Sequence, residues 1–422
     1  MYLTKYLLLI LTAFCISTQA HSTTMLDSLV EEALQNNPDI KAAKVRWEAY
    51  TMRPSQEGSL PNPMIGGRFT NVGFHELTLG DDPRSDIQAY ISQEIPFPGK
   101  LSSQEKISQE ESESQKWIAD ATTRNVIADL KVTYFEWAFI NKSIEITKKN
   151  KELLDKFTKT AESRYEVGMG IQQDVLKAQV ELSGFIERLE LLNEREEIIE
   201  TRIKKILNRP LDSLLGEPEE TPQSDISHTL AEITESTLNL APQLKSSAKL
   251  IDSRAESLKL ARKEYLPDFV VGATYFNRDG GSGNLDDIWQ LSLGLKVPLY
   301  YWRKEKFGVK EAALNFLEAR ENHESTKNNV VFQIKDNYIK AATAEKLLEL
   351  YDTGIIPQST LSLESAISAY EVGKVDFLTL LNNLVTLFNF ELEYHRQLAN
   401  YNTALARLEE ISGMELINQS NI

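Results

Sequence analysis

The longest stretch without a helix breaker limits the possible folds more than any other feature of this sequence. Residues 101–167 contain neither glycine nor proline. At 1.5 Å per residue, a helix of this length extends roughly 100 Å. No globular core is that deep, so we expect the helix to project from the body of the protein. A second helix is expected over residues 171–208, where Pro210 stops it.

An internal repeat divides the chain into two units of similar length. The tetrapeptide Tyr-Glu-Val-Gly occurs at residues 165–168 and again at 370–373, 205 residues later. Unrelated turns that coincide by chance are the simpler alternative, but they do not explain why other landmarks keep nearly the same spacing. These landmarks are Asn37-Pro38 with Ala241-Pro242, and Leu60-Pro61 with Leu266-Pro267.

The joint between the repeats falls in an acidic stretch that Pro218 and Pro222 interrupt. Each repeat is expected to run as helix, β-hairpin, very long helix, turn and long helix. In the second repeat Gly354 and Pro357 interrupt the outgoing helix, so we expect a joint there. The expected segments are a first repeat over 21–215, a linker over 216–227, a second repeat over 228–418 with long helices at 304–371 and 375–412, and a tail over 419–422.

Four segments change from a helical period to a period of two, which is typical of β-strands. In the clearest, residues 287–298, Trp289, Leu291 and Leu293 alternate with polar or small residues. Each segment has about the length that a tilted strand needs to cross a bilayer. A soluble hairpin with one buried face is the alternative for any single segment, but four in repeat-related pairs favour membrane strands. The other three segments are 64–74, 86–96 and 268–278.

An aromatic cluster follows the last of these strands. Tyr300, Tyr301 and Trp302 stand directly before Arg303 and Lys304. Aromatic and basic residues gather where a membrane strand meets the water interface. We therefore expect the three aromatic residues to lie at a membrane interface.

The returning helices carry apolar residues at spacings of three and four. In the second repeat two such stripes lie side by side, one through Leu380, Leu384 and Leu387 and the other through Leu381 and Val385. A helix with two adjacent stripes is held by neighbours on two sides. We therefore expect a wall of helices in a mainly α protein with a small β part. A simple intramolecular coiled coil is the alternative.

The first twenty residues have the pattern of a cleaved secretion signal. Lys5 precedes an apolar stretch over residues 7–16, and Thr18-Gln19-Ala20 resembles a cleavage site. The alternative is a lipoprotein acylated at Cys15, although the bulky Phe14 precedes that cysteine. No later stretch approaches 18 consecutive apolar residues. We therefore expect the exported chain to lie in the periplasm, outside the cell, or in an outer membrane that it enters as β-strands.

Charge and composition exclude several classes of function. The chain has 62 acidic and 46 basic residues and a net charge of −16 at pH 7, the opposite of a nucleic-acid-binding protein. No catalytic motif, phosphate loop or metal-ligand spacing occurs in the sequence. We therefore expect neither an enzyme nor a site for a cofactor or metal. His228, His323 and His395 are expected to be surface or packing residues.

The number of strands implies that several copies of the chain share one pore. Unpaired backbone groups cost several kcal/mol each in hydrocarbon, so a membrane sheet must close on itself. Four strands are too few, because known barrels begin at about eight. Two chains would supply eight strands and three would supply twelve, and larger barrels leave a lumen. The sequence therefore predicts a conduit.

Several of these features resemble the outer-membrane efflux factor (TolC-like) family. The likeness rests on the two-fold repeat, on Asn37-Pro38, on Leu60-Pro61-Asn62-Pro63 and on the paired Tyr-Glu-Val-Gly tips, and it covers essentially the whole mature chain. It implies a homotrimer with a twelve-stranded barrel in Gram-negative outer-membrane lipid and an α-helical tunnel in the periplasm. It also implies two partners, a periplasmic adaptor (membrane fusion) protein and a proton-driven inner-membrane pump.

One segment resembles a particular branch of that family. Residues 92–100, Ser-Gln-Glu-Ile-Pro-Phe-Pro-Gly-Lys, are similar to the variant found in the heavy-metal cation branch. This resemblance implies a role in heavy-metal resistance.

The family resemblance also implies where functional residues lie. Gly168 and Gly373 would end the outgoing helices at the hairpin turns, where a small residue permits the reversal. The hairpin ends would form the periplasmic tip that meets the adaptor and holds the tunnel closed. The remaining tip residues implied in this way are Arg164, Tyr165, Glu166, Tyr370 and Glu371.

Members of the family often carry a constricting acidic ring just past the second turn. The matching positions here are Thr379 and Asn382, so that ring is missing or has moved. Asp376 in the second repeat and Asp174 in the first are the available substitutes, and three copies of either would attract cations. The alternative is that these carboxylates only complement the dipoles of the helices they begin.

A second acidic group lies in the expected loop of the first hairpin. It could gather cations at the outer mouth, although an acidic hairpin loop is more often simply solvated. Its members are His75, Glu76, Asp81, Asp82 and Asp86.

Together these features predict a passive outer-membrane channel of a tripartite efflux system. It would supply no energy and would pass substrate that a pump delivers. A periplasmic coiled-coil scaffold that never enters the membrane is the alternative from another class. The exit channel of a protein secretion system would share the same fold, and the sequence does not state the substrate.

Overall fold

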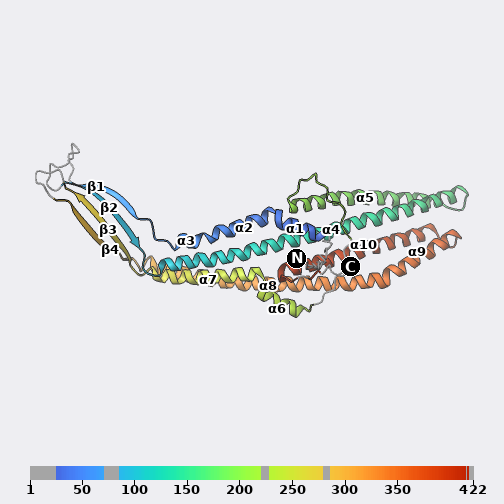
Figure 1. The fold of residues 1–422 in the computed structure, drawn as a ribbon. Helices are drawn as coiled ribbons and strands as arrows, with labels where there is room; N and C mark the ends of the chain where they lie inside the picture. The colour runs from blue at the N-terminus through green and yellow to red at the C-terminus, as the bar shows by residue number, and fades with distance from the viewer. Residues whose placement is uncertain (1–24, 71–84, 220–227, 279–285, 415, 418–422) are drawn as a thin grey trace, which may run out of the picture.

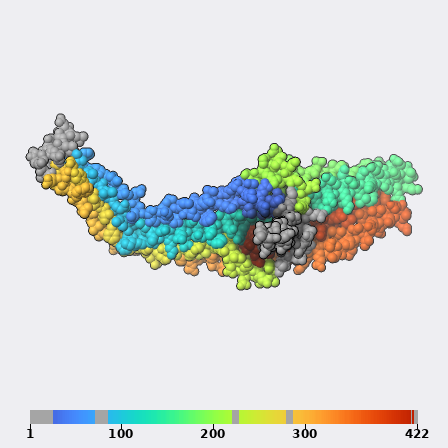
Figure 2. All heavy atoms as spheres, viewed as in Figure 1, coloured from blue at the N-terminus to red at the C-terminus, as the bar shows by residue number. Residues whose placement is uncertain are grey.

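The computed structural model describes residues 25–70, 85–219, 228–278, 286–414 and 416–417. The molecule is long and narrow, with a small sheet at one end and two helical hairpins at the other (Figure 1). The space-filling view shows the same rod, bent where the sheet meets the helices (Figure 2). The expected signal peptide with Cys15 and the tail at 419–422 lie outside the described residues.

Four antiparallel strands form one sheet and follow each other in sequence order. Of the four expected strands, the first (64–74) is described only as far as Thr70, where β1 ends, and residues 71–84 lie outside the described part of the chain. The strands are β1 (Met64–Thr70), β2 (Asp86–Ile95), β3 (Asp268–Asn277) and β4 (Ile288–Lys296).

The two faces of this sheet differ in polarity. Direct cross-strand partners share a face, and the register joins Ile65 to Ile91, Ile91 to Ala273 and Ala273 to Leu291. This apolar face is exposed in the single chain, and Leu291 is 84% exposed. The opposite face carries polar residues, including Thr274 beside Gln290. The four strands with a period of two are therefore confirmed.

The long helix of the first repeat is α4 (Lys100–Glu166), with 67 residues. It begins after Gly99, whose φ of 94° lies in the left-handed region that favours glycine. Lys100 is 4% exposed, and its Nζ lies 2.8 Å from Oδ1 of Asp268 at the start of β3. The backbone N–H of Phe97 donates to the same oxygen. This hydrogen-bonded pair joins the long helix of the first repeat to the sheet of the second.

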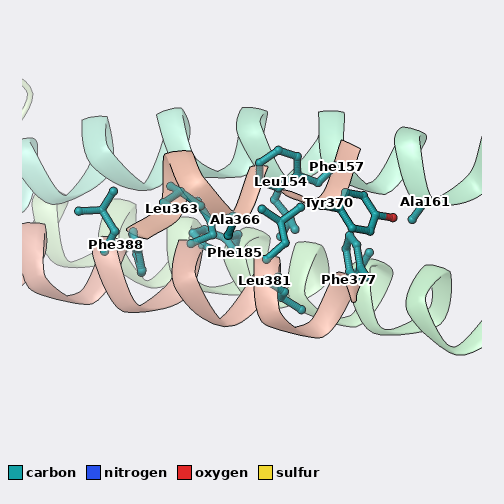
Figure 3. Close-up of a cluster of buried hydrophobic side chains, with 14 of the residues drawn as sticks. Leu154, Phe157, Ala161, Phe185, Leu363, Ala366, Tyr370, Phe377, Leu381 and Phe388 are labelled. Carbon is teal, nitrogen blue, oxygen red and sulfur yellow. The ribbon is translucent and has the colours of Figure 1, made fainter. Parts of the chain in front are cut away.

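In the half of the rod away from the sheet, the helices form a layer. α5 (Gln172–Leu207) packs on α4, α4 packs on α10 (Phe377–Ser412), and α10 packs on α8 (Glu305–Leu350) and α9 (Ile356–Glu371). Figure 3 shows the core between the two hairpins, which includes Phe157, Phe185 and Phe388, and the rings of Phe185 and Phe388 lie 4.8 Å apart. Leu381 and Leu384, one from each apolar stripe of α10, are both buried in this core.

The outgoing helix of the second repeat is not broken at Gly354 and Pro357. α8 continues into α9 through one π-helical turn, Tyr351–Ile355, in which the N–H of Ile356 donates to the carbonyl of Tyr351. Pro357 then lies in the first turn of α9, where its missing N–H is tolerated. The expected joint is thus a π-bulge, and α10 packs along both sides of it.

Short helices complete each repeat. Both α2 and α7 begin at the proline of a repeated landmark. Proline suits the first position of a helix because an N–H there would have no acceptor within the helix. Within the described ranges, no helix combines the length and apolar character needed to cross a membrane. The short helices are α1 (Met25–Asn36), α2 (Pro38–Thr51) and α3 (Arg53–Glu57) in the first repeat, and α6 (Leu230–Leu240) and α7 (Pro242–Lys263) in the second.

Two of these short helices cover one face of the helical layer. Leu29 of α1 packs in a core with Trp137 of α4 and Ile203 of α5. Ile233 of α6 packs in a second core with residues of α8 and α10, among them Tyr401. Within the described part of the chain, α1 and α6 therefore lie on one face of the layer, and we call the opposite face the bare face.

Candidate functional site

The two hairpin turns are built in the same way. Each outgoing helix ends at a glycine in the left-handed region, Gly168 with φ 74° and Gly373 with φ 72°. The N–H of Gly168 donates to the carbonyl of Tyr165, and the N–H of Met169 donates to that of Arg164. The second turn repeats both bonds at the matching positions. This pair of bonds is the Schellman motif, which explains why glycine occupies both positions.

An arginine of the first hairpin binds the second hairpin. Nη1 of Arg164 donates to the carbonyl oxygen of Tyr370 over 2.7 Å, and its guanidinium carbon lies 4.6 Å from the centre of the Tyr370 ring. Tyr370 is buried and meets Phe377 edge to face at 5.8 Å. Ala369 occupies the position of Arg164 in the second turn, so the contact has no reciprocal. The side chain of Arg164 therefore joins the two tips.

The remaining tip residues face solvent. Tyr165, Glu166 and Glu371 are exposed, and the backbone carbonyl oxygen of Glu371 lies 3.5 Å from Nη2 of Arg164. The structure also exposes apolar residues that the sequence reasoning did not single out. These are Val167, Met169 and Val372. The sequence could have indicated these residues, because they stand next to turn glycines, where polar residues are more usual.

Asp174 and Asp376 lie close enough for their charges to interact. Oδ1 of Asp376 accepts the N–H of Thr379 over 2.9 Å and caps α10, and the hydrogen bonds to Thr379 hold the pKa of Asp376 below its ordinary value. Partial burial, and then the charge of Asp376, raise the pKa of Asp174 in the first turn of α5. The structure thus shows the capping role for Asp376 and places one carboxylate of each hairpin near the other.

The aromatic cluster lies between β4 and α8. Tyr300, Tyr301 and Trp302 are each at least half exposed. The ring of Trp302 lies edge to face with the rings of both tyrosines, 5.9 Å from Tyr300 and 5.4 Å from Tyr301. Tyr265 adds a further ring, 6.2 Å from Tyr301. The cluster is therefore a broad, exposed aromatic surface at the junction of sheet and helices.

The other acidic and histidine candidates form no cluster in the described residues. Of the acidic loop, only Asp86 is described, and its carboxylate accepts the amide of Gln88. His323 bonds the hydroxyl of Ser247, and His228 lies 4.0 Å from Glu232. No group of three or more metal-ligating side chains occurs in the part of the chain that the structure describes. The remaining loop members, His75, Glu76, Asp81 and Asp82, lie outside the described residues.

Comparison with known proteins identifies the family. A family model described as outer membrane efflux protein matches residues 29–209 and 233–414. The toxin and drug export protein A of Aggregatibacter actinomycetemcomitans is 21% identical over 346 residues, which cover 77% of this chain and 72% of that protein. The outer membrane protein TolC of Vibrio cholerae is 22% identical over 414 residues, which cover 94% of this chain and 90% of that protein.

A solved structure shares the fold. The outer-membrane channel OprN matches with a TM-score of 0.81 at 16% identity, over 93% of this chain and 91% of that chain. The two matched segments of the family model fall on the two repeats described above. The chain therefore belongs to the outer membrane efflux protein family, whose members are efflux channels in the outer membrane with a large periplasmic tunnel.

Proposed function

We propose that three copies of this chain form a passive exit duct, which receives substrate from a proton-driven inner-membrane pump through a periplasmic adaptor. The observation that carries the proposal is the sheet, whose apolar face is exposed and whose edge strands β1 and β4 each pair on one side only within the described sheet. Unpaired edges are not tolerated in hydrocarbon, so further copies must pair with them. Three copies supply twelve strands, and their polar faces would line a water-filled lumen.

The helical layer supports the same assembly. Its two outer helices, α5 and α8, each carry exposed apolar residues at spacings of seven and eleven, which bring them to one side of a helix. Because these helices lie at opposite edges of the layer, a head-to-tail contact between copies would close a ring. The residues are Val180, Leu191 and Ile198 on α5, and Phe332, Ile339 and Leu350 on α8.

The hairpin tips supply the entrance to the duct. In this proposal the bond from Arg164 to the Tyr370 carbonyl holds the two hairpins together in the closed state. Asp174 and Asp376 would give the entrance a negative charge in each copy. The adaptor would bind the exposed tip surface, where Tyr165, Glu166 and Glu371 surround the apolar residues Val167, Met169 and Val372.

The aromatic cluster would lie where the barrel leaves the membrane. Tyr300, Tyr301 and Trp302 lie between the end of β4 at Lys296 and the start of α8 at Glu305, at the end of the sheet that joins the helices. Tyr and Trp side chains favour this depth because each combines an apolar ring with a polar O–H or N–H group that hydrogen-bonds to water. The sheet would then lie in outer-membrane lipid and the helices in the periplasm.

Two classes of cargo fit the duct. A relative is named for toxin and drug export, which supports toxins or drugs as cargo. If the toxin is a protein, the duct would be a protein secretion channel, which is the second candidate function. The resemblance of residues 92–100 supports heavy-metal cations. However, Lys100 of that segment is buried against Asp268, a structural role that does not depend on cargo. We therefore assign the choice of cargo to the pump.

Membrane extraction followed by conductance measurement tests the proposal. The full-length protein should need detergent for extraction, migrate as an oligomer on gels unless boiled, and open ion-conducting pores in planar bilayers. Protein denatured by boiling and added at the same detergent concentration is the matched control. A chain that is freely soluble and monomeric would instead support the scaffold alternative.

A further inference from the structure

A groove lies over the middle of α4, between α5 and α10, with a volume of about 720 Å³. Apolar side chains form a substantial part of its lining. The apolar part, called the floor below, is formed by Val132 and Phe139 of α4, Leu192 of α5 and Leu392 of α10. An open groove that exposes hydrocarbon to water favours the burial of an apolar group.

Three arginines line the rim of this groove, Arg188 and Arg195 of α5 and Arg396 of α10. Arg188 and Arg195 are seven residues apart, which places them on the same face of α5. Among the described residues that line the groove, the carboxylates are Glu136 and Glu393. The groove therefore carries a net positive charge, in a chain whose net charge is −16.

The ion pairs at the rim leave the arginines available to a ligand. Nε of Arg195 lies 3.8 Å from Glu136, and Nη2 of Arg396 lies 3.2 Å from Glu393, while both arginine side chains are more than half exposed. Exposed pairs of this kind contribute little stability. The guanidinium of Arg188 lies 5.0 Å from the centre of the Phe388 ring, and no ion pair of Arg188 is recorded in the described part of the chain.

The groove opens on the bare face of the helical layer. Tyr401 and Leu405 of α10 are buried on the face that α6 covers. Thr403, which lines the groove, is two residues from each of them and so points to the other side of the helix. In the duct proposed above, on which this step rests, the bare face encloses the lumen.

We infer that this groove is a binding site on the tunnel wall for an amphipathic organic anion. A carboxylate, sulfate or sulfonate head would accept paired hydrogen bonds from the guanidinium groups, and an apolar body would cover the floor. A hydrated metal cation gains nothing from such a rim. The inference rests on the proposed function and adds to it a class of cargo that the tunnel wall binds, while the pump still selects what enters the duct.

Calorimetric titration of the full-length, detergent-extracted protein tests the site. The probes are 2-naphthalenesulfonate and the charge-reversed 2-naphthylmethylammonium, in an uncharged detergent. The sulfonate should bind and the ammonium should not. Arg188→Gln should weaken sulfonate binding about fivefold, and Arg188→Gln with Arg396→Gln should weaken it further. Arg202→Gln, an exposed arginine of α5 outside the groove, is the matched control and should bind like the parent.

Unchanged affinity in the double variant, or equal binding of the two probes, overturns the site. Its place on the tunnel wall is tested separately by the reversal potential in a KCl gradient. Arg188→Glu with Arg396→Glu should shift the potential toward cation preference, and an unshifted potential overturns the placement. Failure of the proposed function would be distinct, since the parent protein would then conduct no ions while the titration could still be read.

Discussion

The two hairpin tips share the sequence Tyr-Glu-Val-Gly and the same backbone turn, yet their tyrosines lie in different surroundings. Tyr165 is 46% exposed, whereas Tyr370 is 6% exposed, beneath Arg164 and against Phe377. The two turns have the same backbone conformation because each depends only on its glycine and on local hydrogen bonds. The side-chain environments differ because they depend on the neighbouring hairpin. Repetition of a sequence therefore predicts a shared backbone and leaves the role of each side chain open.

The largest expected effect separates the two tyrosines. Tyr370→Ala should destabilise the protein by about 3 kcal/mol, because it removes a buried ring and leaves a cavity. Tyr165→Ala, the matched control, should change stability by less than about 0.5 kcal/mol. Denaturant unfolding followed by circular dichroism measures both values. Equal losses at the two positions would contradict the buried placement of Tyr370.

Removal of the arginine should sharpen the difference between the tips. Arg164→Ala deletes a charged hydrogen bond worth about 1.5 kcal/mol and should make open entrances about tenfold more frequent. Single-channel recording in planar bilayers measures this frequency. Arg164→Lys should restore only part of the closure, because an ammonium cannot stack flat on the Tyr370 ring. An unchanged frequency in Arg164→Ala would remove this residue from the gate.

The turn glycines should respond equally, unlike the tyrosines. No atom lies within 4 Å of a Cβ built on Gly168, and the nearest atom to one on Gly373 lies at 3.7 Å. Alanine at either position would therefore cost only the strain of a left-handed backbone, about 1 kcal/mol. Thermal unfolding of Gly168→Ala and Gly373→Ala should give matching shifts. A much larger shift at one of them would show that the two turns are not equivalent.

The smallest expected effects concern Asp174 and Asp376, whose ionisation should change the stability of the protein with pH in opposite directions. The pKa of Asp376 is depressed in the fold, so its contribution is present above the ordinary value of 3.8 and is lost as pH falls through the folded pKa. The pKa of Asp174 is raised, so its ionisation opposes folding and stability is lost as pH rises from 3.8 through the folded pKa. Asp376→Ala should therefore lower the unfolding midpoint at pH 7, and Asp174→Asn should raise it.

Thermal unfolding between pH 3 and pH 7 checks these signs. Shifts of the same sign in the two variants would contradict the pKa directions. The conductance of Asp376→Ala is a further test of the entrance, since removal of a carboxylate should raise single-channel conductance and reduce cation preference. Unchanged conductance and preference would leave Asp376 as a helix cap alone.

Much of the fold was predictable because it follows from local signals. The absence of glycine and proline over residues 101–167 predicts a helix, and α4 occupies Lys100–Glu166. The alternation around Leu291 predicts a strand with one apolar face, and β4 presents that face. At Gly354 and Pro357 the same local signals predicted a joint in an interrupted helix. The structure has a π-bulge there instead, within a continuous helix that packs on α10.

The candidate site was predictable only in part. Tip residues such as Tyr165 and Gly373 could be placed from the repeated tetrapeptide, because a turn is a local structure. The bond from Arg164 to Tyr370 joins residues 206 positions apart, and nothing in the sequence near either residue announces it. The mutual influence of Asp174 and Asp376 likewise arises only when the two hairpins pack. Long-range contacts of this kind require the folded chain.

Native mass spectrometry of the detergent-extracted protein tests the central claim most directly. A single chain cannot complete its sheet in lipid, since β1 and β4 are each paired on one side only within the described sheet. We therefore predict particles that contain three copies of the chain and that separate only on heating. Particles with a single chain, stable in membranes without further copies, would contradict it.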